Sequence, residues 1–200
     1  LRVVADLYPE TWASVWPAMV AALDGGRLDD VFVGIARDNP EWWPAFVDVA
    51  CRTARDAGAL QRMAAVRATA GTASAAEQRC LIDRLQRENR WPNAYQVWLN
   101  SLPERDRQRI GYVYNGDFEL PISNVGFDWT MAAQDGVLVD AQPIGGAGGR
   151  RALKVEFLNK RWSGPPVQQY LMIPPGSYRF EGRGRADQLN TWLGVQWGLY

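Results

Sequence analysis

The chain has 200 residues, with 22 Lys and Arg residues against 22 Asp and Glu residues, and it contains no histidine. The missing histidine excludes Ser-His-Asp and Cys-His catalytic groups, histidine-ligated metal sites and imidazole pH switches. A net charge of zero argues against a chain that holds nucleic acid by bulk electrostatics, so we expect no nucleic-acid partner. No apolar run approaches the length of a bilayer span, so we expect no membrane-spanning segment.

The chain changes character near residue 113. Residues 1–113 are rich in Ala and Arg and space their apolar residues as helices do. Residues 114–200 contain most of the glycines and alternate apolar with polar residues. The pattern predicts a helical domain over 1–113 and a β domain over 114–200.

The helical part contains an internal repeat. Three corresponding segments each look like a tight turn between two helices: 22–28, 54–60 and 85–91. The first helices of the hairpins are expected at about 10–23, 41–57 and 74–88, and the second helices at 28–37, 60–70 and 91–101. Ser74 and Glu77 fit a capping box at the start of one of them. A period of roughly 31 to 34 residues is typical of an α-solenoid, and the hairpins resemble tetratricopeptide repeats in period and form.

Six of the ten tryptophans fall in the helical part, where packing between repeats is their simplest role. The adjacent pair Trp42 and Trp43 is the exception, because adjacent helical positions point about 100° apart and at most one of them is central in the core. The other either covers a neighbouring repeat or is exposed for a protein partner. We therefore name Trp42 and Trp43 as candidate partner-binding residues.

Cys51 and Cys80 are the only cysteines, and the repeat places them on neighbouring first helices. Two alternatives remain open. Both are buried free thiols that pack as small apolar residues, or they form one disulfide, which implies an oxidising compartment. Two isolated cysteines do not predict a metal site.

The second part reads as a series of short strands, each with one apolar face. They are expected near 116–120, 127–133, 136–142, 150–158, 167–173, 177–185 and 192–199. The clearest alternation places Leu153, Val155 and Phe157 on one face. Many such strands predict a β-sandwich or jelly roll.

Three blocks of this part carry a resemblance: 115–119 with Phe127-Asp128-Trp129, then 149–155, then the hairpin over 167–180. In order and spacing they resemble the galactose-binding-like jelly rolls, which include carbohydrate-binding modules. Such a domain needs roughly 130 to 150 residues, so we expect an incomplete sandwich, truncated at the C-terminus. The combination with TPR-like hairpins also resembles bacterial proteins of envelopes and exopolysaccharide assemblies, which implies a periplasmic or envelope-associated binding protein.

The resemblance also implies ligand residues. The family's structural calcium site, where present, uses residues near the 115–119 block, which makes Asp117 and Glu119 weak calcium candidates. No other cofactor is expected.

Sugars bind to aromatic faces flanked by planar polar groups, and this chemistry selects the glycan candidates. Trp162 lies in a loop between expected strands, where it is either a sugar platform or a lid over the sandwich. Tyr170 and Trp192 lie opposite the apolar series, with Gln168 and Arg183 as polar neighbours. The Tyr170 face either contacts a glycan or packs on the helical domain.

These observations give one leading hypothesis and one alternative. The chain is expected to be a non-catalytic binding or scaffold protein, whose helical repeats dock a protein partner and whose β-sandwich contacts a polysaccharide. The alternative is a purely structural scaffold without a small ligand, in which the β domain caps the solenoid. No two carboxylates share a strand-end context, so no enzyme is predicted.

Overall fold

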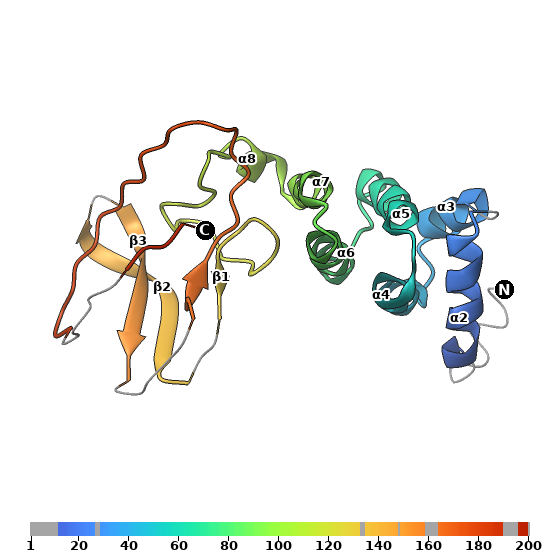
Figure 1. Cartoon of the computed structure of the whole chain (residues 1–200), viewed down its shortest axis with the longest axis horizontal. Helices are drawn as coiled ribbons and strands as arrows, with labels where there is room; N and C mark the ends of the chain where they lie inside the picture. The colour runs from blue at the N-terminus through green and yellow to red at the C-terminus, as the bar shows by residue number, and fades with distance from the viewer. Residues whose placement is uncertain are drawn as a thin grey trace.

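The computed structural model describes residues 12–26, 29–132, 135–147, 149–158, 164–189 and 196–199. Helices fill the first half of the chain, and α2 lies at the opposite end of the molecule from the strands (Figure 1). The helices are α2 (Trp12–Asp24), α3 (Asp29–Asp38), α4 (Trp43–Thr53), α5 (Ala57–Thr69), α6 (Ala75–Arg87), α7 (Trp91–Ser101) and α8 (Glu104–Arg107). The strands are β1 (Thr130–Met131), β2 (Val137–Ala147), β3 (Gly149–Phe157) and β4 (Val167–Gln168).

The longer helices stack in two layers. In one layer α2 packs on α4 and α4 on α6, and in the other α3 packs on α5 and α5 on α7. Each hairpin therefore buries its apolar faces against the next hairpin along the chain. No described helix combines the length and the apolar character that crossing a membrane requires.

Local sequence sets several of the helix boundaries. The Asp56 side chain accepts a hydrogen bond of 2.7 Å from the Gly58 N–H and caps α5. The Ser74 hydroxyl accepts one of 3.2 Å from the Glu77 N–H and caps α6. Pro44 and Pro92 stand in the first turns of α4 and α7, where a missing N–H costs no helical hydrogen bond.

The core is continuous from the helices into the segment that follows α8. Its fully buried side chains in the helices include Trp43, Phe46, Cys51, Leu81, Ile82, Leu85 and Trp98. Tyr114 and Phe127, which follow α8, belong to the same buried cluster. The start of the second part of the chain therefore shares a core with the last hairpin.

A buried ion pair lies between the hairpins. Arg67 on α5 is 2% exposed and Glu77 on α6 is 8% exposed. The Arg67 guanidinium donates to both carboxylate oxygens of Glu77, over 2.7 Å from Nε and 2.9 Å from Nη2. This two-pronged geometry is the strongest form of a protein ion pair.

The remaining Arg67 donors reach two other segments. Nη1 donates to the Ala36 carbonyl over 3.1 Å and to the Asn39 side-chain oxygen over 2.8 Å, at the end of α3. Nη2 donates to the Thr72 carbonyl over 2.7 Å, and the guanidinium carbon lies 5.7 Å from the centre of the Trp43 ring. One side chain thus fixes the ends of α3 and α5 and the starts of α4 and α6.

The second part of the chain does not form a sandwich. β1 pairs antiparallel with β4, and β2 pairs antiparallel with β3, which gives two separate two-stranded sheets. Along the longer sheet Val139 lies opposite Val155 and Ala141 opposite Leu153. β2 and β3 occupy the ranges where strands were expected at 136–142 and 150–158.

The predicted fold class, an α-solenoid followed by a β-sandwich, is therefore wrong. Over the described residues the structure has seven helices and two small two-stranded sheets, and this overturns the resemblance to galactose-binding-like jelly rolls and carbohydrate-binding modules. The helical content remains compatible with a helical domain. Of the last expected strand, 192–195 lie outside the described residues.

The sandwich prediction failed because alternation of apolar and polar residues describes one strand at a time. An alternating pattern shows that one strand face is apolar, but it does not show that a second sheet covers that face. From Gln169 to Leu189 the chain runs over the outside of the strand-bearing end with neither helix nor strand (Figure 1). Within the described residues, no backbone–backbone hydrogen bond joins 169–189 to another segment.

The buried ion pair generates the first prediction. Glu77→Gln leaves the Arg67 charge buried without its carboxylate, so we expect the free energy of unfolding to fall by about 3 to 5 kcal/mol. Urea denaturation followed by circular dichroism measures this loss.

Arg52→Ala is the control, because its ion pair with Asp48 on α4 is exposed and contributes about 0 to 1 kcal/mol. Equal losses in the two variants would show that Arg67 and Glu77 do not form a buried pair.

Candidate functional site

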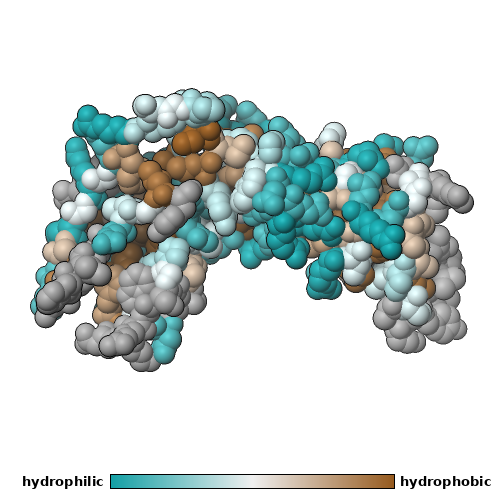
Figure 2. All heavy atoms as spheres, viewed as in Figure 1, coloured by the Kyte–Doolittle hydropathy of each residue, from teal (hydrophilic) through white to brown (hydrophobic). Residues whose placement is uncertain are grey.

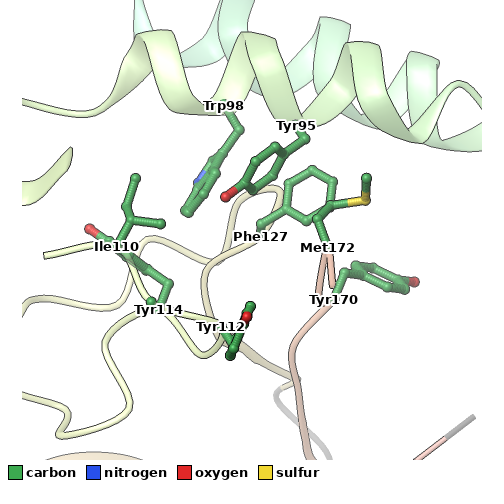
Figure 3. A pocket seen from close by; sticks show the side chains of 9 residues that line it. Tyr95, Trp98, Ile110, Tyr112, Tyr114, Phe127, Tyr170 and Met172 are labelled. Atoms are coloured by element: carbon green, nitrogen blue, oxygen red, sulfur yellow. The ribbon is translucent and has the colours of Figure 1, made fainter. Parts of the chain in front are cut away.

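An aromatic cluster joins the last long helix to the second part of the chain (Figure 3). α7 contributes Tyr95 and Trp98, which point toward side chains of three later segments. Those side chains are Ile110, Tyr112, Tyr114, Phe127, Tyr170 and Met172. They line a small hollow that opens to the surface.

The rings of this cluster are in direct contact. Phe127 lies edge-on to Tyr95, with ring centres 4.9 Å apart, and 5.6 Å from Trp98. Tyr114 lies edge-on to Trp98, with ring centres 5.0 Å apart. Such edge-to-face pairs add roughly 0.5 to 1.5 kcal/mol each beyond the burial of their surface. The cluster is therefore a stable joint between the two parts.

Gln169 ties the backbone of this joint. Its Nε2 donates to the Tyr114 carbonyl over 2.8 Å and to the Phe127 carbonyl over 3.2 Å. Its Oε1 is buried without a hydrogen-bond partner among the described residues. The segment after β4 is thus held to the segment before β1 by one amide group.

The hollow is suited to packing rather than to proton transfer. Its lining residues carry no carboxylate, thiol or amine, and the space between them is about that of one water molecule. Burial, followed by the negative charges of Asp128 and Asp106, raises the pKa of Tyr114 to about 12. The Tyr114 hydroxyl therefore stays protonated at neutral pH.

The candidate partner-binding tryptophans lie in the first hairpins. Trp43 is fully buried, with its ring centre 5.4 Å from that of Phe46. Trp42 is half-buried, and its ring centre lies 5.9 Å from that of Trp16. Trp43 is thus the central residue of the pair, and Trp42 covers its neighbours. A role for either in partner binding stays a prediction.

The structure describes three of the glycan candidates: Gln168, Tyr170 and Arg183. Trp162 and Trp192 lie outside the described residues. Tyr170 is partly exposed and its ring centre lies 5.0 Å from that of Trp91, so it packs on the helical part. Gln168 in β4 and Arg183 beyond it are exposed. Because no carbohydrate-binding fold is present over the described residues, the glycan hypothesis is withdrawn.

The calcium candidates are each engaged with an arginine. An Asp117 oxygen accepts a hydrogen bond of 3.0 Å from the Arg109 side chain, and a Glu119 oxygen accepts one of 3.0 Å from the Arg151 N–H. Among the described residues, no group of three or more cysteines and carboxylates is placed to hold a metal ion. Calcium binding by this pair stays a prediction.

Sequence reasoning missed the aromatic joint and the Arg67 network. Phe127 and Trp129 were assigned to a sandwich strand, and nothing local shows that Phe127 packs on α7. Arg67 offered one signal, because a charged residue in a helix whose repeat neighbours are apolar requires a buried partner.

Comparison with known proteins found no protein family, no curated relative and no solved structure that matches this chain.

The second prediction concerns Gly126, whose backbone lies close against Ile82 of α6 and Trp98 of α7. Its φ is +63°, and a Cβ there would stand 2.8 Å from Trp98 Cδ1 and 3.3 Å from Ile82 Cγ2. We expect Gly126→Ala to lower the free energy of unfolding by about 2 to 5 kcal/mol, through backbone strain and overpacking together.

Gly71→Ala separates the two causes. Gly71 has a φ of +67° but open space around its Cβ position, so its substitution carries the strain alone, about 1 to 2 kcal/mol. If chemical denaturation gives the same loss for both variants, the contact with Trp98 is refuted.

Tyr114 generates a prediction about alkaline pH. Its pKa is about 12 in the folded chain and about 10 in the unfolded chain, so folding favours the protonated phenol. The stability from this difference is fully present below pH 10 and is lost as pH rises through 12.

We expect the wild type to lose more stability than Tyr114→Phe across that window, as measured by urea denaturation at several pH values. Tyr112→Phe is the matched control, because that side chain is 62% exposed. Parallel stability curves for wild type and Tyr114→Phe up to pH 12 would contradict the assignment.

Proposed function

We propose that this chain is a non-catalytic scaffold that binds a protein partner along residues 177–185, with a strand of the partner adding to this extended segment. The observation that carries the proposal is the distribution of exposed apolar residues. Among the described residues, Val31 is the only large apolar side chain of the helices that is highly exposed. All the others follow α8: Tyr112, Leu138, Ile144, Leu158, Tyr170, Met172, Ile173, Tyr178, Phe180, Leu189, Trp197 and Leu199.

Figure 2 shows the same division on one face of the molecule. Polar residues cover its middle, and a group of strongly apolar residues lies at the strand-bearing end. Exposed apolar surface of this kind is typical of a surface that another protein covers. The helical stack therefore serves as support, and the binding surface lies beyond it.

The 177–185 segment alternates aromatic and charged residues as a strand does, although it is not paired as a strand in the described structure. Tyr178 and Phe180 are each 46% exposed; the ring centre of Tyr178 lies 5.5 Å from that of Tyr112, and that of Phe180 lies 5.7 Å from that of Trp197. The alternate positions carry Arg179, Glu181, Arg183 and Arg185. Its backbone forms no backbone–backbone hydrogen bond with the rest of the described chain, so its N–H and C=O groups are available to an added strand.

The positive charge of the 177–185 segment indicates which kind of partner strand would bind. Arg179 forms an ion pair with Glu181, which leaves Arg183 and Arg185 as the excess positive charge on the polar face. A partner strand that places acidic residues on this face and apolar residues on the other complements both. We therefore infer that the partner contributes an extended segment alternating acidic and apolar residues.

A specific observation also favours a second, structural role. Without the second part of the chain, α7 would expose Trp91, Tyr95 and Trp98 at the end of the helical stack. In the structure, Phe127 and Tyr170 pack on these rings. These contacts support the alternative hypothesis, in which the second part of the chain caps the helical stack. The two roles are compatible, because capping uses residues up to 172 and partner binding uses 177–185.

The test uses a fluorescent peptide as long as residues 177–185 that alternates valine and glutamate. We expect saturable binding to the whole chain in fluorescence anisotropy. Replacing glutamate by lysine reverses the charge of the peptide, and N-methylating its alternate amides removes the backbone pairing, so we expect either change to abolish binding.

Arg183→Glu combined with Arg185→Glu should weaken binding of the glutamate peptide by at least about tenfold. Arg37→Glu on α3 is a charge-reversal control outside this segment, and it should leave binding of the glutamate peptide unchanged. Absence of binding, or equal binding of the N-methylated peptide, would overturn strand addition.

A further inference from the structure

Two free thiols meet between the helices of one layer. Cys51 lies near the end of α4 and is fully buried, whereas Cys80 lies on α6 and is partly exposed. α4 and α6 pack directly against each other, and the two thiols lie close enough for each to shift the pKa of the other. Neighbouring helices thus place one protected and one accessible sulfur side by side.

Arg84 connects the two helices that carry this pair of thiols. Its Nη1 donates to the Cys51 carbonyl over 2.8 Å and its Nη2 to the Ala54 carbonyl over 2.7 Å. Because Arg84 stands one helical turn after Cys80 on α6, its contacts fix the end of α4 opposite that cysteine. The thiol pair is therefore part of a fixed helix contact.

The surroundings differentiate the two sulfurs. The hydrogen bond from Cys51 lowers the pKa of Cys80, although burial and the nearby Asp48 and Asp83 act against this. The same hydrogen bond and burial raise the pKa of Cys51. Arg52 on α4 also favours the Cys80 thiolate, and Arg84 favours a Cys51 thiolate. The accessible sulfur is thus the nucleophile, and the buried one keeps its proton.

We propose that Cys51 and Cys80 form a dithiol site that hydroperoxides oxidise to an intramolecular disulfide. Cys80 is the residue that reacts with the peroxide, and Cys51 is the residue that resolves the product. The site lies within the helical stack and is independent of partner binding along 177–185.

The chemistry balances in two steps. The Cys80 thiolate attacks one oxygen of hydrogen peroxide, the O–O bond breaks, and the departing hydroxide takes up the proton that Cys80 had released, giving water and a sulfenic acid. The Cys51 sulfur then attacks the Cys80 sulfur, the S–O bond breaks, and the departing hydroxide takes the Cys51 proton. Two thiols and one peroxide become one disulfide and two waters.

The bond would cross-link two consecutive hairpins. It closes a loop from α4 to α6 that contains all of α5, including Arg67. Restricting the unfolded chain in this way is expected to raise the Tm by about 10 °C.

The test treats the purified whole chain with hydrogen peroxide. We expect an intact mass lower by two hydrogens, a peptide map that joins Cys51 to Cys80, and a higher Tm that dithiothreitol reverses. An unchanged mass, or a disulfide between two chains on a non-reducing gel, would overturn the proposal.

Single serine variants test the assignment of roles. In Cys51→Ser the sulfenic acid on Cys80 has no resolving thiol, so dimedone should label Cys80. In Cys80→Ser we expect peroxide consumption to be at least about tenfold slower. Labelling of Cys51 in Cys80→Ser at the rate seen for Cys80 would refute the division of roles.

Discussion

A guanidinium group buried among helices constrains everything around it, because each of its N–H groups needs an acceptor. Arg67 meets this need with the Glu77 carboxylate, the Ala36 and Thr72 carbonyls and the Asn39 amide oxygen. These acceptors belong to three different segments, and all must be in place at once for the charge to be tolerated. The requirement therefore fixes how α3, α5 and α6 meet, and it positions Trp43 beneath the guanidinium.

Other polar side chains connect helix ends of consecutive hairpins in the same way. Arg84 reaches the carbonyls at the end of α4, just as Arg67 reaches a carbonyl at the end of α3. Asp24, at the end of α2, accepts hydrogen bonds from the Arg55 and Asp56 N–H groups before α5. These contacts span about one period of the sequence repeat, so each hairpin is held to the next by polar contacts with helix ends as well as by apolar packing.

Sequence reasoning located helices well because helical periodicity and caps are local. The repeat and the turn at 85–91 predict a helix at 91–101, which is where α7 lies. The strands 136–142 and 150–158 likewise correspond to β2 and β3. What covers a strand depends on residues far away in sequence, and alternation around Leu153 contains no information about them. For the same reason the sequence left two alternatives for Tyr170, contact with a glycan or packing on the helical part. The structure shows its contact with Trp91.

The joint at Gly126 and Phe127 explains why the second part divides into a fixed and an open portion. Up to Tyr170 the chain is held to α7 by aromatic contacts and by the Gln169 amide. Beyond it, Tyr178 and Phe180 retain nearly half of their surface in water, at a cost of roughly 25 cal/mol for each Å² left uncovered. The same fold buries the rings of Trp98 and Phe127 almost completely, in contrast to those of Tyr178 and Phe180. The exposed face along 177–185 has no such cover among the described residues, and it is the face to which we propose that a partner strand is added.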